Sequence, residues 1–213
     1  QSLDINPVPN KIQIGLKGLG AGSIPSVGRE SALENIDKLR KAIENNTEMV
    51  FITAGMGGGT GTGAAPVIAQ IAKEMGILTV GIVTIPFGFE GRKRRQYAEE
   101  GIKELKENVD ALLIICNDKL RELYGNLKMT EAFGKADDIL TTAAKSIAEL
   151  ITCVGGINVD LEDVKTVMKG SGVAIMGSGI AEGENRAMKA VESALNSPLL
   201  NDNNITGAKD ILL

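Results

Sequence analysis

The chain has 213 residues, 43% of them hydrophobic, which is enough for one large domain or a domain and a half. Its formal net charge of −4 and the lack of a long basic run argue against a nucleic-acid partner, and without an apolar run of about 18 residues or a signal peptide we expect no membrane insertion. The chain contains no histidine, which excludes His-ligated metals and leaves acid–base chemistry mainly to carboxylates.

The N-terminal part contains a first glycine-rich stretch between two short elements. Residues 11–15 alternate like a strand, and residues 18–25 (GLGAGSIP) are typical of a turn. A helix is then expected over 31–44, because its apolar residues recur at helical spacing. These apolar residues are Leu33, Ile36, Leu39 and Ile43.

The central motif is the glycine-rich stretch 55–63 (GMGGGTGTG). It follows the apolar, strand-forming residues 49–54 and precedes a helical pattern over 64–75, in which Pro66 is expected in the first turn. A glycine turn between strand and helix lets the backbone approach a ligand closely, and directs N–H groups and the positive helix end at an anion. The two threonines of the stretch add hydroxyl donors. The motif predicts a phosphate cradle rather than a merely flexible turn.

The motif alone leaves two types of phosphate ligand to compare. No lysine follows the glycines, so the Walker pattern is excluded. Residues 59–64 match G-x-G-x-x-A, which leaves an NAD-binding oxidoreductase open as an alternative. That fingerprint also needs an acid at the end of the next strand, and strand 77–84 is followed by no acid until Glu90.

Strands and helices alternate through the middle of the chain. Strands at 49–54, 77–84 and 111–116, with helices at 64–75 and 95–107, predict a parallel sheet covered on both faces. Ligands bind such sheets at the carboxyl ends of the strands. The four cations 92–95 oppose the dipole of the following helix, which predicts a compensating anion or acidic partner. Cys116 and Cys153 are expected to be reduced thiols in the core.

The C-terminal part begins with the longest helical pattern, over 130–151, which spans about 33 Å. Beyond it, Asp160 is a candidate N-cap, with Glu162 and Asp163 in the first turn of the next helix. A catalytic interpretation, in which these carboxylates orient a water, stays open. A strand at 173–176, a helix at 184–196 and a strand start at 211–213 indicate an incomplete second α/β unit.

Residues 57–63 (GGGTGTG) resemble the signature of the tubulin/FtsZ family of GTPases. Four further stretches resemble motifs of its bacterial members in the same order: 87–94 (FGFEGRKR), 117–120 (NDKL), 131–138 (EAFGKADD) and 158–165 (NVDLEDVK). The resemblance covers essentially the whole chain.

The resemblance implies an α/β fold with three parts. A Rossmann-like GTPase domain with a parallel sheet would span 1–129, a long central helix 130–152, and a synergy loop with the start of an incomplete second α/β domain 153–213. Compared with the family, we expect this sequence to be truncated at both ends, without the first strand and loop and without most of the second sheet.

The resemblance also implies a site for GTP and GDP with Mg²⁺ bridging phosphate oxygens. Ala21, Gly22 and Ser23 would sense the γ-phosphate, while Asn117 and Asp137 would bind the guanine base. The remaining implied nucleotide contacts are the phosphate-loop residues Gly55, Gly57, Gly58, Gly59, Thr60, Gly61 and Thr62, the ribose and phosphate contacts Thr84, Glu90 and Arg94, and the stacking ring Phe133.

In the same family, residues matching Asn158, Asp160 and Asp163 complete the GTPase site of the next subunit. The length of the central helix separates these acids from their own chain's nucleotide, and a head-to-tail contact generates filaments. The implied function is a GTPase that polymerises into the bacterial cell-division ring, with assembly-dependent hydrolysis. Its place would be the cytoplasm at mid-cell, and its partners other copies of itself and, through an absent C-terminal tail, membrane-tethering division proteins. A non-catalytic fragment with only filament contacts remains the second alternative.

Overall fold

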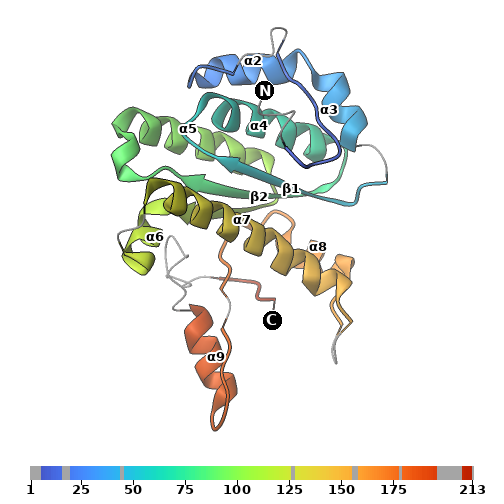
Figure 1. Ribbon diagram of the computed structural model, residues 1–213. Helices are drawn as coiled ribbons and strands as arrows, with labels where there is room; N and C mark the ends of the chain where they lie inside the picture. Colours follow the sequence, from blue (N-terminus) through green and yellow to red (C-terminus); the bar gives the residue numbers. More distant parts are fainter. Residues whose placement is uncertain are drawn as a thin grey trace.

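The computed structural model describes residues 6–15, 20–43, 46–125, 128–154, 158–177, 179–195 and 208–212. Its centre is a parallel sheet of β1 (Met49–Gly55), β2 (Leu78–Ile85), β3 (Ala111–Cys116) and β4 (Gly172–Ala174), in that order. Helices lie on both faces of the sheet (Figure 1). The prediction of a parallel sheet covered on both faces is therefore confirmed.

The sequence of β2 explains its central position. Seven of its eight residues are buried, as expected for an apolar strand covered on both sides. Val80 and Ile82 pack with α7 (Met129–Thr152) and α8 (Leu161–Met168), whereas Val83 packs with α4 (Gly59–Glu74) and α5 (Arg92–Asn108). The edge strand β1 is more exposed.

One face of the sheet is covered by α4 (Gly59–Glu74) and α5 (Arg92–Asn108), with α2 (Pro25–Leu33) and α3 (Ile36–Ile43) packed outside α4. The helix expected over 31–44 is therefore two helices. The first of them, α2, begins at Pro25, six residues before the expected start. The break between the two lies at Asn35, whose side-chain amide donates to the Ser31 carbonyl at 2.9 Å.

Contacts between glycines set the α2–α4 distance. A Cβ at Gly28 would overlap the Gly59 carbonyl, and a Cβ at Gly63 would overlap the Pro25 carbonyl. This packing lets α4 begin at Gly59, five residues before the expected start. Pro66 consequently lies inside the helix and not in its first turn, so the sequence interpretation of Pro66 was wrong.

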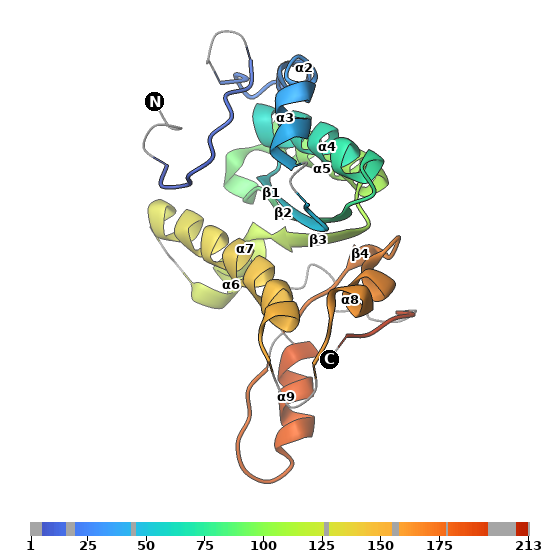
Figure 2. The same ribbon diagram turned by 90° about the vertical axis from the view of Figure 1, so that its right-hand side faces the viewer.

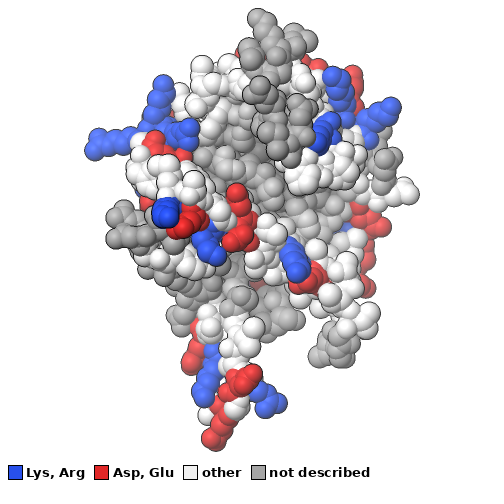
Figure 3. Space-filling model, viewed as in Figure 1, with Lys and Arg blue, Asp and Glu red and all other residues white. Residues whose placement is uncertain are grey.

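The cations at the start of α5 are partly compensated by the chain itself. Arg94 pairs with Glu90 at 2.7 Å, and Arg95 lies 3.4 Å from Glu99 and 3.9 Å from Asp118. For these two arginines an external anion is not required. On the face that Figure 3 shows, positive and negative side chains are interspersed.

The other face of the sheet carries α7 (Met129–Thr152) and α8 (Leu161–Met168). Ala136, Ile139, Ala143 and Ile147 of α7 are buried against the sheet. The short helices η1 (Gly88–Glu90) and α6 (Asn117–Tyr124) follow β2 and β3, and α9 (Arg186–Leu195) projects away from the sheet (Figure 2).

Several smaller expectations differ from the structure. Residues 11–15 and 211–212 form no strand, and β4 covers 172–174 rather than 173–176. Both cysteines are free, but Cys153 is exposed and Cys116 only half-buried, so they are not core thiols. Within the described ranges, no helix is long and apolar enough to cross a membrane, and no group of three or more Cys, Asp or Glu side chains could hold a metal ion.

Candidate functional site

The carboxyl ends of three strands place most of the predicted site residues at one edge of the sheet. Gly55 of β1 is in register with Thr84 of β2, and Thr84 with Ile115 of β3. The glycine loop follows Gly55, and Asn117 begins α6 two residues beyond Ile115. This is the edge at which parallel α/β sheets bind their ligands.

The glycine loop presents the N-terminus of α4 to this edge. Gly57 has φ +93°, and a Cβ there would lie 2.7 Å from the Arg94 carbonyl oxygen, so only glycine fits. The N-cap is Gly58, which makes no side-chain cap bond to the first turn. The first N–H groups of α4 therefore lack intrahelical acceptors, and together with the helix dipole they form a site for an anion.

The first glycine-rich stretch lies directly beside this loop. A Cβ at Gly59 would lie 2.6 Å from Ala21 Cβ and 2.9 Å from the Ile24 nitrogen. Gly22 and Ser23 are exposed in a turn closed by a 2.9 Å bond from the Ile24 N–H to the Ala21 carbonyl. The two stretches, distant in sequence, thus lie in contact at the N-terminus of α4.

The two threonines of the loop have different environments. Thr60 is exposed, whereas Thr62 is only 3% exposed. The Thr62 Oγ1 accepts a hydrogen bond of 2.8 Å from the Gly57 N–H. The sequence suggested the same role for both hydroxyls, and the structure separates them.

Asn117 is the most unusual polar residue at this edge. It is 4% exposed, and its Oδ1 is the one buried side-chain N or O atom of the described residues without a hydrogen-bond partner. Buried polar atoms nearly always have partners, so an unpaired acceptor calls for an explanation. An acceptor at this position suits a ligand with N–H donors.

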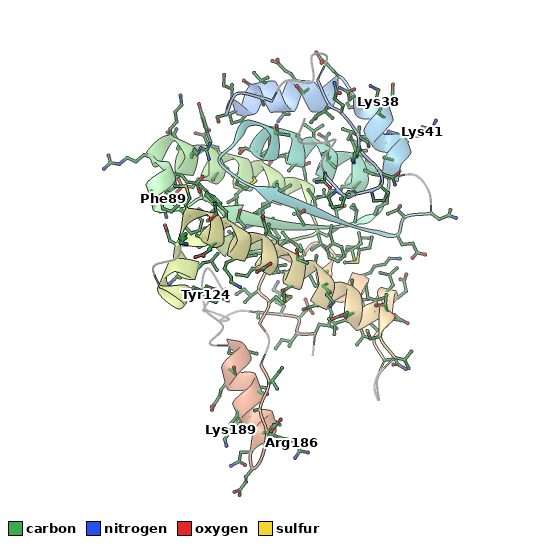
Figure 4. The ribbon with its side chains drawn as sticks, viewed as in Figure 1. Lys38, Lys41, Phe89, Tyr124, Arg186 and Lys189 are labelled. Atoms are coloured by element: carbon green, nitrogen blue, oxygen red, sulfur yellow. The ribbon has the colours of Figure 1, made fainter. Side chains whose placement is uncertain are left out.

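An aromatic cluster lies next to Asn117. The neighbouring residue Asp118 accepts a 2.9 Å bond from the Gly88 N–H, which ties α6 to η1. Phe87 and Phe89 stack with ring centroids 5.0 Å apart, and Phe133 of α7 meets Phe87 edge-on at 5.4 Å. Phe89 projects beside the start of α7 (Figure 4) and is 55% exposed. Asp137, one turn beyond Phe133, is also exposed.

Glu90 and Arg94 form an internal pair. Glu90 Oε1 accepts from the Phe87 N–H at 2.9 Å, and Oε2 accepts from Arg94 at 2.7 Å. The Glu90 side chain is 10% exposed and that of Arg94 46%, so the guanidinium can still reach a ligand. Sequence reasoning missed Phe87, Phe89 and Asp118, although the three-residue spacing of Phe87 and Glu90 across η1 could have indicated a cap.

A second cluster of predicted residues begins α8. Asp160 Oδ1 accepts from the Asp163 N–H at 2.9 Å, and Asp163 Oδ2 accepts from the Asp160 N–H at 3.1 Å. The capping interpretation is confirmed. Both aspartates and Asn158 are exposed, and each capping bond uses one oxygen of its carboxylate.

Lys165 fixes α8 to the opposite edge of the sheet. Its Nζ lies 2.7 Å from Glu162 and 3.0 Å from Glu48, which directly precedes β1. The hydrogen bond to Glu162, and to a smaller extent the one to Glu48, raises the pKa of Lys165. The acids at the start of α8 therefore lie near the amino ends of the strands, and the 24 residues of α7, about 36 Å of helix, separate them from Asn117.

A family model described as the Tubulin/FtsZ family, GTPase domain, matches residues 1–125. The chain belongs to the tubulin/FtsZ family. A second model, the C-terminal domain of the FtsZ family, matches residues 172–213. These matches support neither the oxidoreductase nor the non-catalytic alternative.

Individual members of the tubulin/FtsZ family are similar along most of the chain. Cell division protein FtsZ of Wigglesworthia glossinidia brevipalpis is 54% identical over 100% of this chain and 56% of its own. The protein of the same name from Pseudomonas aeruginosa is 56% identical over 92% of this chain and 50% of its own. An empty FtsZ dimer from M. jannaschii has a TM-score of 0.82 at 50% identity, covering 88% of this chain and 55% of that one. The chain thus spans about half the length of the curated relatives it matches.

Proposed function

We propose that this chain binds GTP and GDP at the carboxyl edge of its sheet, and that it is part of a GTPase that polymerises head to tail into the bacterial cell-division ring. The observation that carries the proposal is the buried, unpaired Asn117 Oδ1 at the same sheet edge as the α4 N-terminus. Guanine offers N–H donors that an amide oxygen can accept, and a phosphate chain suits the helix end. Relatives named cell division protein FtsZ support the same function.

Each part of the nucleotide has residues near its expected place. The N–H groups of Gly59, Thr60 and Gly61 would hold phosphate oxygens, and the adjacent turn of Ala21 to Ser23 would meet the γ-phosphate. The guanine base would stack on Phe133 and bond to Asn117 and Asp137, with Thr84, Glu90 and Arg94 around the ribose and nearby phosphate.

Mg²⁺ would bind through phosphate oxygens and water rather than through a protein cage. This fits a chain whose described residues offer no cluster of three potential metal-binding side chains. When bound, the ion neutralises charge on the phosphates.

Hydrolysis would be completed between subunits. Asp160, Asp163 and Asn158 cannot reach a nucleotide in their own chain, because the 24 residues of α7 separate the two clusters. In a head-to-tail contact the exposed carboxylates reach the neighbour's nucleotide and orient the attacking water. The cytoplasm at mid-cell, with membrane-tethering division proteins as further partners, is the proposed setting.

A titration tests the binding step directly. The 213-residue chain is titrated with fluorescent GTP, GDP and NAD in the presence of Mg²⁺. We expect saturable binding of the guanine nucleotides and none of NAD. Binding of NAD alone would contradict the proposal, and binding of none would leave this chain with filament contacts only.

A further inference from the structure

Thr62 lies inside the phosphate loop and not on its surface. It is the fourth residue of α4, at the end of the first turn, and is 3% exposed. Its hydroxyl oxygen accepts a buried hydrogen bond of 2.8 Å from the Gly57 N–H. Thr60, two residues earlier, is exposed. Two residues in a helix are about 200° apart, so only one of these side chains can face outward.

A glycine on α5 accommodates the Thr62 methyl group. A Cβ at Gly101 would overlap Thr62 Cγ2 and would lie 3.1 Å from Met56 Cε. Gly101 is buried at the α4–α5 contact. The methyl group is therefore confined on one side by α5, while the hydroxyl is confined on the other by Gly57.

These contacts divide the donors of the loop into two groups. The Gly57 N–H is bonded inside the loop, and Gly57 itself is held in the left-handed region at φ +93° against the Arg94 carbonyl. The N–H groups at the start of α4 remain directed at the ligand edge. The hydrogen bond from the Gly57 N–H to Thr62 Oγ1, here called the inner bond, fixes the position of the loop. The position of the loop in turn fixes the direction of the N–H groups at the start of α4.

We propose that Thr62 is a positioning residue that holds the phosphate loop in its binding conformation, and that the Thr62 side chain does not contact phosphate. Gly101 orients Thr62 because it leaves room for the Thr62 methyl group against α5. The proposal rests on the proposed nucleotide site. It assigns direct phosphate contact to the N–H groups of α4 and to Thr60 instead.

The test compares Thr62→Val with Thr62→Ser in the 213-residue chain. Valine keeps the methyl packing but removes the acceptor, whereas serine keeps the acceptor. Amide hydrogen exchange at Gly57 is measured by NMR without nucleotide, and GTP and GDP affinities by titration. In Thr62→Val we expect Gly57 to exchange faster by about ten- to a hundredfold and both nucleotides to bind about tenfold more weakly, as for a buried donor left without its partner. In Thr62→Ser both quantities should stay close to those of the unmodified chain.

Two further variants separate positioning from contact. Thr60→Val removes the exposed hydroxyl and should leave Gly57 exchange unchanged while weakening nucleotide binding. Gly101→Ala should reproduce the Thr62→Val pattern, because its Cβ displaces Thr62, whereas Gly134→Ala on α7, which has open space around it, should not.

The outcomes are distinct. Weaker binding by Thr62→Val without faster Gly57 exchange would make Thr62 a direct ligand and overturn the proposal. Faster exchange with unchanged affinity would also overturn it, because the inner bond would then position nothing. If the unmodified chain binds neither nucleotide, the proposed function fails, and Gly57 exchange alone decides whether Thr62 holds the loop.

Discussion

At Asn117 we expect the stability of the fold and the proposed binding of guanine to oppose each other. Its buried Oδ1 has no partner, and an unsatisfied buried acceptor costs about 1–3 kcal/mol. Asn117→Leu keeps the branching at Cγ and removes this cost, so we expect the nucleotide-free chain to unfold at equal or higher denaturant concentration. The same variant should lose its preference for guanine over adenine nucleotides, as measured by competition titration.

A buried asparagine with partners provides the control for this prediction. Asn35 is 9% exposed, donates to the Ser31 carbonyl at 2.9 Å and accepts from Lys38 at 3.1 Å. Asn35→Leu should therefore destabilise the chain by about 1 kcal/mol and leave base preference unchanged. A loss of stability in Asn117→Leu equal to that in Asn35→Leu would show that Asn117 has a structural partner.

At the scale of elements, α8 depends on its capping box. Asp160→Ala removes the acceptor of the Asp163 N–H and should lower the free energy of unfolding by about 1 kcal/mol, measured by urea denaturation. Asp160→Asn keeps an oxygen in the same place and should lower it by much less. Equal losses in both variants would assign the stabilising effect to the negative charge at the helix start rather than to the hydrogen bond.

The anchor of α8 predicts a dependence on alkaline pH. Hydrogen bonds to Glu162 and to Glu48 raise the pKa of Lys165 from 10.5. A group with a raised pKa in the folded state stabilises the fold below its unfolded pKa and loses this effect as pH rises through the folded value. The difference in unfolding midpoint between the unmodified chain and Lys165→Met should therefore be constant up to about pH 10 and shrink above it. Lys169→Met, an exposed lysine one turn further along, is the matched control.

The boundaries of elements also show how far the sequence could predict the fold. The parallel sheet and its covering helices were indicated by the apolar runs of β1, β2 and β3 and by the helical spacing of apolar residues sustained along α7. At these elements, which residues are buried follows directly from the pattern. The start of α4 at Gly59 could not be predicted, since glycine has low helix propensity and the cause is packing of Gly59 and Gly63 against α2.

The site was predictable to a similar degree. The glycine turn between β1 and α4 and the Asp160 cap follow from local spacing in one segment, and the structure contains both, whereas phosphate binding by the turn stays a prediction. The Asp118 bond to the Gly88 N–H joins two segments 30 residues apart, so no local pattern contained it. The partners of Glu90 and Thr62 are the main-chain N–H groups of Phe87 and Gly57, three and five residues away, which the side-chain sequence indicates only by spacing. The sequence therefore located the segments of the proposed site, but not which of their donors and acceptors already have hydrogen-bond partners within the chain.

At the scale of the whole molecule, the two clusters of proposed site residues lie at opposite edges of one sheet. The residues proposed to bind nucleotide follow the carboxyl ends of β1, β2 and β3, and Lys165 ties the α8 acids to Glu48 at the amino end of β1. Both positions are fixed by the same core, since α7 and Val164 of α8 pack in one cluster with β2 and β3. A rigid separation of this kind suits a subunit that offers one half-site at each end.

This arrangement predicts that two inactive variants restore activity together. In the intact protein, Asp163→Asn keeps the oxygen that accepts the Asp160 N–H but removes the charge, so GTP binding should persist while turnover falls by about 10²–10³-fold. Gly59→Ala, whose Cβ would lie 2.6 Å from Ala21 Cβ, should lose binding instead. When the two variants are mixed equally, about a quarter of head-to-tail junctions join an intact nucleotide site to intact acids, and phosphate release should recover accordingly. A mixture no more active than its components would show that Asp163 acts within its own chain or that the junction is not head to tail.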